Sequence, residues 1–182
     1  MNRLLATIGL AATLTFSASG GFAKDTPGQK FIGKAIEGNL AEVQMGQLAQ
    51  EKGTRDDVKS YGRMLQQDHS AANQQAVAAA SAAGVTPPTE PNKKQKADHA
   101  KMAKLSGAAF DSAFAKHMVQ DHKKDIAEYQ KEAKRNDGQV SQYASATLPT
   151  LQKHLESAQA LAKGGRSALE RRGIAPESVN TC

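Results

Sequence analysis

The chain has 182 residues, and its 24 lysines and arginines against 18 aspartates and glutamates give a net charge of +6. The charge is interleaved with acids, tryptophan is absent and only 4% of the residues are aromatic. We therefore exclude nucleic-acid binding, which relies on clustered basic residues and aromatic stacking platforms. The single cysteine, Cys182, excludes an internal disulfide and leaves a free thiol or a dimer through Cys182 as alternatives.

Residues 1–23 have the pattern of a secretory signal peptide. Arg3 gives a positive start, an uncharged and mainly apolar run extends from Leu4 to Phe16, and small residues lead up to Ala23. The run is too short for a membrane-spanning helix, which needs about 20 residues. We predict cleavage after Ala23, a periplasmic or secreted protein with the periplasm preferred, and no transmembrane segment in the mature chain.

The first long helix is predicted over residues 28–52. Thr26 supplies an N-cap, Pro27 occupies the first turn, and Gly53 ends the helix. Small and apolar residues recur along it with helical spacing. This stripe consists of Phe31, Ala35, Gly38, Met45, Leu48 and Ala49.

The second long helix is predicted over residues 55–83. Thr54 is expected to cap it, with Asp57 completing an acidic capping box, and Gly84 to close it. A proline-rich loop follows. The apolar stripe of this helix consists of Val58, Tyr61, Leu65, Ala72, Ala76 and Ala79.

Three further helices are expected after the loop. A short charged helix covers residues 93–105, and long helices cover residues 109–135 and 140–163, the last with Pro149 inside it. Two glycines then end the bundle, so residues 24–163 form one domain and residues 164–182 a flexible tail. The pattern predicts an all-α, antiparallel four-helix bundle with a short extra helix in the crossover between the second and third long helices.

One ionisable residue interrupts the apolar stripe of each long helix near its middle. These residues are Glu42, His69, His122 and His154. Aligned helices would bring the four together at one depth in the core, where an unpaired carboxylate costs several kcal/mol. Three imidazoles and a carboxylate are a suitable donor set for Fe, Zn, Mn or Cu. We therefore expect a transition metal ion in the core.

Two aspartates directly precede histidines of this set, Asp68 before His69 and Asp121 before His122. Adjacent helical residues diverge by about 100°, so both members of such a pair cannot face one point equally well. Asp68 is expected to support a ligand. Asp121 is a further candidate ligand, because Phe110 precedes it by eleven residues, as Phe31 precedes Glu42.

A second interpretation requires no cofactor. The buried Glu, His and Asp residues would form only a structural polar network, and the protein would be a non-catalytic envelope stress or interaction protein with an unidentified protein partner. The sequence has no phosphate-binding glycine loop, nucleophile elbow or paired-cysteine motif, which disfavours a serine or cysteine hydrolase. An enzyme is therefore less favoured than a binding protein, and a redox enzyme is the least supported of the three hypotheses.

Four ordered motifs resemble one exported bacterial family, the domain of unknown function 4142. They are EGNLAEV at 37–43, MLQQDH at 64–69, GAAFD with MVQDH between 107 and 122, and LPTLQKH at 148–154. The resemblance implies a ferritin-like four-helix fold for residues 27–162, and members are often labelled outer membrane proteins. Di-iron ferritin-like enzymes have Glu-x-x-His motifs, whereas Gln66 and Leu151 stand three residues before His69 and His154. This departure argues against a di-iron oxidase.

Overall fold

The computed structural model of the protein describes residues 25–136 and 138–171, with side chains up to residue 164. Within these ranges the chain is entirely α-helical and contains no strand, which confirms the predicted class. The five helices are α1 (Pro27–Lys52), α2 (Asp56–Ala82), α3 (Lys93–Ala103), α4 (Gly107–Ala133) and α5 (Gln139–Arg171). The expected signal peptide, most of the expected tail and Cys182 lie outside the described residues. None of the described helices is long and apolar enough to span a membrane.

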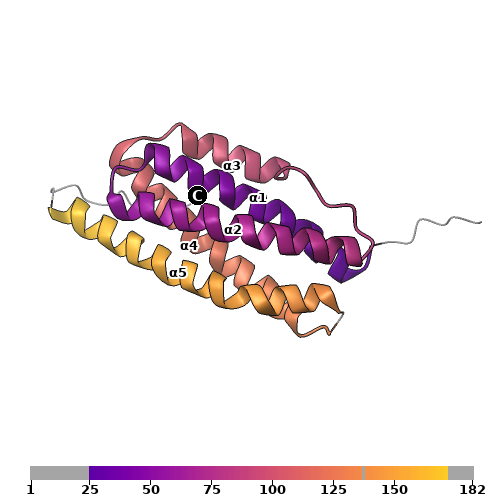
Figure 1. Ribbon diagram of the computed structural model, residues 1–182. Coiled ribbons are helices and arrows are strands. Elements are labelled where there is room, and N and C mark those ends of the chain that lie inside the picture. The colour runs from indigo at the N-terminus through magenta and orange to yellow at the C-terminus, as the bar shows by residue number, and fades with distance from the viewer. Residues whose placement is uncertain (1–24, 137, 172–182) are drawn as a thin grey trace, which may run out of the picture.

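The long helices α1, α2, α4 and α5 lie side by side, and the short α3 lies along the outside against α1 (Figure 1). Contacts between their ends fix the direction of each helix. The Gln29 side chain at the start of α1 donates to the Ala83 carbonyl after α2, and Thr54 between these helices bonds Asp111 at the start of α4. α1 and α5 therefore run one way, and α2 and α4 the other. The crossover that contains α3 returns the chain over the length of the bundle, along the outside of α1.

The hairpin of α1 and α2 depends on two glycines. A Cβ atom added to Gly46 would lie 2.5 Å from the Gly62 carbonyl oxygen, and one added to Gly62 would lie 2.6 Å from the Gly46 carbonyl oxygen. Neither position has room for a side chain, so the two helix backbones approach as closely as glycine permits. The N-cap predicted at Thr26 is confirmed, and Gln29 completes a capping box with it.

The cap predicted for the second helix was wrong. Arg55 occupies the N-cap position of α2 without a side-chain capping bond. The Thr54 hydroxyl and backbone N–H both donate to the Asp111 carboxylate, at 2.5 and 3.0 Å, and Asp57 pairs with Arg55. A tertiary contact between α4 and the hairpin loop thus replaces the expected local capping box.

The predicted end of the last helix was also wrong, because α5 continues through the glycine pair at 164–165 to Arg171. A glycine within a helix costs only about 1 kcal/mol, which packing offsets. Arg55 supplies that packing. Its guanidinium lies over Gly164 and donates to the Leu161 carbonyl at 3.2 Å.

The core consists of two apolar clusters at opposite ends of the long helices. The first contains Leu65, Phe110, Phe114 and Met118, and the second contains Ile32, Ile36, Tyr129 and Tyr143, each with further neighbours. Five buried polar side chains lie on the same helices between these clusters. They are Asn39, Glu42, His69, His122 and His154. We call this set the polar layer.

Candidate metal centre

Three helices each contribute one histidine to the polar layer: His69 from α2, His122 from α4 and His154 from α5. Their side chains are 3%, 2% and 0% exposed. One ring nitrogen of each lies within 4.8 Å of one ring nitrogen of each of the others, and together they could hold a metal ion. The ring centres are 5.2 to 5.8 Å apart. The inward direction of all three histidines follows from the helical spacing. Each lies one turn from a buried apolar residue, which is Leu65, Met118 or Ala158.

Every one of these imidazoles has one nitrogen bonded to an oxygen acceptor. Nδ1 of His122 lies 3.0 Å from the carbonyl oxygen of Met118, and Nε2 of His154 lies 2.9 Å from the carboxylate of Asp68. Nδ1 of His69 lies 2.9 Å from Oδ1 of Asn39. Each acceptor assigns the proton to the nitrogen facing it, and the opposite nitrogen then carries a lone pair.

Hydrogen bonds behind His69 hold Asn39 in the orientation that this assignment requires. The Asn39 amide NH₂ donates to the Tyr143 hydroxyl at 2.9 Å, and that hydroxyl lies 3.1 Å from the Tyr129 hydroxyl. The amide oxygen of Asn39 therefore faces His69 as an acceptor. Bonds of this kind orient histidine ligands and fix their tautomers at metal centres.

The assignment leaves three lone pairs directed towards each other. They belong to Nε2 of His69, Nε2 of His122 and Nδ1 of His154. Nε2 of His122 lies 3.3 Å from Nδ1 of His154, and Nε2 of His69 has no hydrogen-bond partner among the described residues. Two facing lone pairs repel, whereas a cation between them is bound by both. Two nitrogens that each lie about 2.0–2.1 Å from a tetrahedral ion are about 3.3 Å apart, so this pair already has the spacing of two ligands.

Burial keeps the three imidazoles neutral, which is the form that binds a metal. It lowers the pKa of His69 well below its usual value, and the neighbouring His122 and His154 add to this effect. Burial and the proximity of His154 lower the pKa of His122 to about 4. Burial also lowers the pKa of His154, although its bond to Asp68 opposes the change. A metal ion therefore displaces no proton from the three nitrogens at neutral pH.

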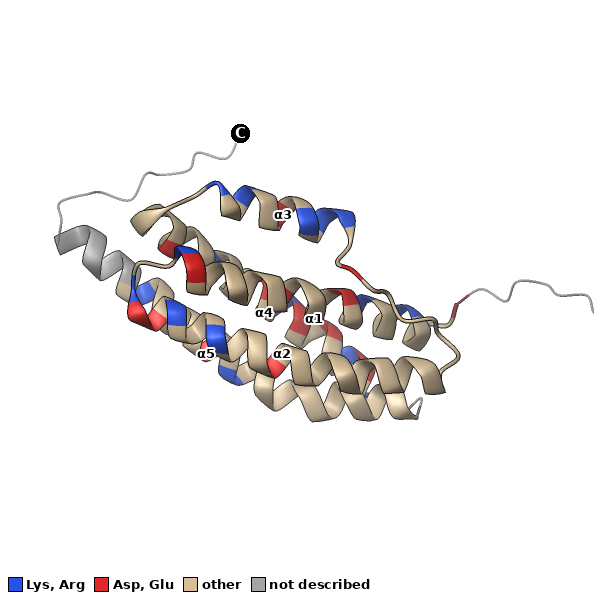
Figure 2. Cartoon of the chain, turned by 45° about the horizontal axis from the view of Figure 1, so that its top comes forward, with Lys and Arg blue, Asp and Glu red and all other residues tan. Residues whose placement is uncertain are grey.

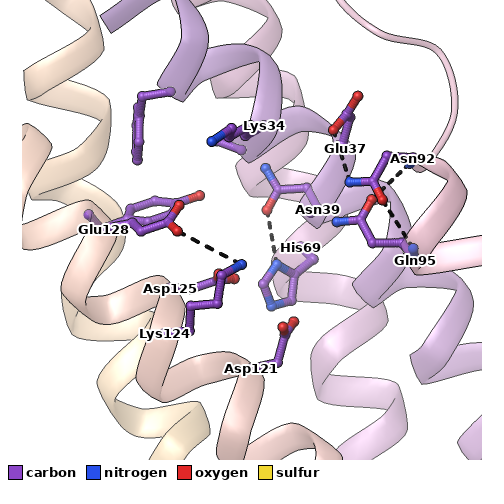
Figure 3. Close-up of a pocket in the computed structure, with 14 residues that line it drawn as sticks. Lys34, Glu37, Asn39, His69, Asn92, Gln95, Asp121, Lys124, Asp125 and Glu128 are labelled. Carbon is purple, nitrogen blue, oxygen red and sulfur yellow. Dashed lines mark hydrogen bonds and ion pairs between the residues drawn. The ribbon is translucent and has the colours of Figure 1, made fainter. Parts of the chain in front are cut away.

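The two acidic residues predicted as ligands, Glu42 of the polar layer and Asp121, lie beside each other. Glu42 is 3% exposed, and its Oε2 has no hydrogen-bond partner among the described residues. Burial, together with the charge and hydrogen bond of Asp121, raises the pKa of Glu42 well above its usual value. Asp121 points towards the ring of His69 (Figure 3). Neither carboxyl belongs to the group of ligand atoms within 4.8 Å, which the three histidines alone form among the described residues.

Three polar residues near the histidines were not anticipated from the sequence. Asn39 bonds His69, Tyr143 supports Asn39, and Asp125 lines a cavity beside His69. Asn39 could have been found, because it lies three residues before Glu42 and seven after Ile32 on the buried face of α1. We had placed its neighbour Gly38 on that face, but Gly38 is only half-buried. The supporting role predicted for Asp68 corresponds to a bond with His154 rather than with its neighbour His69.

Comparisons with known proteins give one match. A family model described as a domain of unknown function, DUF4142, matches residues 13–161. No curated protein matches the chain, and no solved structure does. The matched range includes every residue of the polar layer.

Proposed function

Because the chain belongs to the DUF4142 family, whose description assigns no activity, we propose a function from the site itself: the protein binds one divalent transition-metal ion through His69, His122 and His154. The donor atoms are Nε2 of His69, Nε2 of His122 and Nδ1 of His154. The observation that carries this proposal is the 3.3 Å separation of two lone-pair nitrogens whose opposite nitrogens are bonded to acceptors.

The donor set narrows the class of ion. Three neutral imidazoles suit Zn²⁺, Fe²⁺, Mn²⁺ or Cu²⁺ rather than Ca²⁺ or Mg²⁺, which prefer oxygen ligands. Glu42 and Asp121 are the carboxyl groups nearest in the sequence pattern to the histidines, and we propose one of them as the fourth ligand. An ion held by three histidines and a carboxylate has no obligatory open position, which suits storage or buffering better than catalysis.

The proposal includes the class of fold and the compartment. Two long helices run one way and two run the other, and one long crossover joins α2 to α4. This is the arrangement of ferritin-like bundles, which hold metals between facing helices. The predicted signal peptide directs this function to the periplasm.

The competing interpretation is a structural polar network in an envelope stress or interaction protein. It requires a different protonation of the same histidine nitrogens. If Nδ1 of His122 and Nε2 of His154 keep the protons assigned above, a hydrogen bond between Nε2 of His122 and Nδ1 of His154 needs a second proton on one of the two rings, and that ring is then charged. Burial lowers the pKa of both rings and opposes this state. The metal-bound form satisfies all three nitrogens without a charged imidazole.

Elemental analysis tests the proposal. The mature protein, purified from the periplasm without a histidine tag, is expected to contain about one transition-metal ion per chain, and a His122→Gln/His154→Gln variant none. The matched control is His99→Gln/His117→Gln, which removes two half-buried histidines outside the site and should retain the ion. Wild-type protein that stays free of metal after exposure to Fe²⁺, Zn²⁺, Mn²⁺ and Cu²⁺ would contradict the proposal.

A further inference from the structure

A cavity of about 250 Å³ lies beside the polar layer, between α1, α4 and the start of α3. Its wall includes four carboxylates and two lysines, so it carries a net negative charge. These residues are Glu37, Asp121, Asp125, Glu128, Lys34 and Lys124. Figure 2 shows the acidic positions on both α1 and α4. The buried His69 also contributes to the wall, so the cavity reaches one of the three histidines.

Three of the four carboxylates already have partners, and one of these is Asp121, which is hydrogen-bonded to Glu42. Glu37 accepts a hydrogen bond from the Asn92 amide at 3.1 Å, and Glu128 lies 3.8 Å from the Lys124 ammonium group. Asp121 and Asp125 are half-buried, and neither forms an ion pair with a described lysine or arginine. Burial and the charge of Asp121 raise the pKa of Asp125 to about 7. A divalent cation between the two carboxylates would relieve this repulsion.

His69 lies at the inner end of the cavity. In Figure 3 the ring stands between Asn39 and Asp121, with Nδ1 bonded to Asn39. Its other nitrogen, Nε2, lies on the side of Asp121 and is the buried atom without a hydrogen-bond partner. An ion held by Asp121 therefore lies on the same side of the ring as the lone pair that would receive it.

An approach to the histidines from the side of Asp68 offers no lone pair to an incoming ion. Asp68 is 33% exposed, so solvent comes near the layer there as well. However, Asp68 faces the protonated Nε2 of His154, at 2.9 Å, and the lone pair of that ring points inward. A cation arriving beside Asp68 would meet an N–H group rather than a ligand.

We infer that Asp121 and Asp125 form a second, oxygen-donor cation position in this cavity, through which a divalent metal ion enters and passes to the three histidines. The inference rests on the proposed function, because it names the route to that site. Carboxylates bind a divalent ion that still carries water ligands, and the ion then exchanges its water for imidazole nitrogens. Charge of one sign inside a narrow opening raises the local concentration of the opposite ion and its association rate.

Stopped-flow loading of the metal-free protein with Co²⁺ tests this route. The chain has three tyrosines and no tryptophan, so quenching of tyrosine fluorescence reports the arrival of Co²⁺. Asp125→Asn keeps the shape of the side chain and removes its charge, and should slow association about tenfold at low ionic strength. Glu128→Gln, compared at pH 8, is the matched control, because it removes a carboxylate from the same wall that is already paired with Lys124. It should change the rate less than twofold.

Equilibrium dialysis of the same samples distinguishes a failure of the proposed entry route from a failure of the proposed metal binding. Asp125→Asn is expected to reach one bound Co²⁺ per chain, only more slowly. Association at the wild-type rate, or equal slowing by Glu128→Gln, would overturn the route while leaving the histidine site intact. Wild-type protein that binds no Co²⁺ at all would overturn the function and, with it, the route. Circular dichroism of both variants verifies that the helices are formed.

Discussion

Two layers of the core lie one helical turn apart on the same helices and differ in composition. Leu65 precedes His69 by four residues on α2, and Met118 precedes His122 by four on α4. The first member of each pair belongs to an apolar cluster and the second to the polar layer. Burial stabilises the apolar residues, by about 25 cal/mol per Å² of apolar surface. Burial disfavours the charged forms of the histidines and of Glu42, as their shifted pKa values show.

The comparison indicates why the polar layer exists. Well-packed apolar residues in place of buried polar groups are often neutral or stabilising, so a helical core alone has no need of this layer. The apolar clusters account for the fold, and the metal ion that we propose would account for the polar layer. Variants of the apolar clusters should therefore change the stability of the metal-free protein. Variants of the polar layer should change the affinity for the metal.

The largest effect is expected in the apolar cluster, for Phe114→Ala. Phe114 is fully buried and stacks on Phe110, with 5.7 Å between the ring centres. Its ring centre lies 6.0 Å from that of Tyr61. The cavity left by its ring should reduce the free energy of unfolding of the metal-free protein by about 3–5 kcal/mol. Urea unfolding followed by circular dichroism measures this change. A loss below about 1 kcal/mol would mean that the cluster does not hold the helices together.

In the polar layer, Asp68→Ala should act on the metal. The substitution removes the acceptor that orients His154, and changes of this kind weaken metal binding about 10- to 100-fold. Isothermal titration with Zn²⁺ measures the affinity. Gln67→Ala, at an exposed neighbouring position, should leave it unchanged. Equal affinities for Asp68→Ala and wild type would refute the assigned tautomer of His154.

Contact between α1 and α2 can be tested with two glycines of one helix. Gly46→Ala places a methyl group against the Gly62 carbonyl and should destabilise the protein by about 2 kcal/mol, because the helices must separate. Gly33→Ala has no atom within 4 Å of the added methyl and should stabilise α1 by up to about 1 kcal/mol. Thermal unfolding of both variants measures the difference. The same sign for both changes would contradict the close approach.

The smallest effect is expected at the cavity, and it depends on pH. The pKa of Asp125 is raised to about 7 in the folded protein, against about 3.9 in an unfolded chain. The folded state thus retains a proton that the unfolded state has lost, so this group reduces stability as pH rises from about 4 through 7. A pKa difference of about 3 sets an upper limit of about 4 kcal/mol, which contact of the half-buried carboxyl with solvent reduces. Asp125→Asn should therefore stabilise the metal-free protein by about 1 kcal/mol at pH 8 and by nothing measurable at pH 4. Equal stabilisation at both values would assign the gain to packing.

Helical spacing was sufficient to predict the long helices and the inward direction of the histidines. Each of these features depends on residues within one or two turns of the same helix, as for Leu65 and His69. The cap of α2 and the end of α5 were mispredicted because distant residues decide them. Asp111 takes the hydrogen bonds of Thr54 from 57 positions away, and Arg55 lies over Gly164 of α5 and bonds the Leu161 carbonyl, which is 106 positions away.

The arrangement within the polar layer was less predictable than its membership. Sequence spacing places Asp68 and His69 next to each other, yet Asp68 bonds His154, which lies 86 positions further along the chain. The rotation of α2 against α5 decides that pairing, and it cannot be predicted from the sequence of either helix alone. Asp125 is similar, because its importance depends on a cavity that α1, α3 and α4 form together.

The most direct test of the metal centre is X-ray diffraction from crystals loaded with Zn²⁺, with data collected on both sides of the zinc absorption edge. We predict one anomalous peak in the polar layer, about 2.0–2.1 Å from Nε2 of His69, Nε2 of His122 and Nδ1 of His154. A loaded crystal with no peak between the three rings, and an undisturbed contact between His122 and His154, would contradict the metal centre and favour a structural polar network.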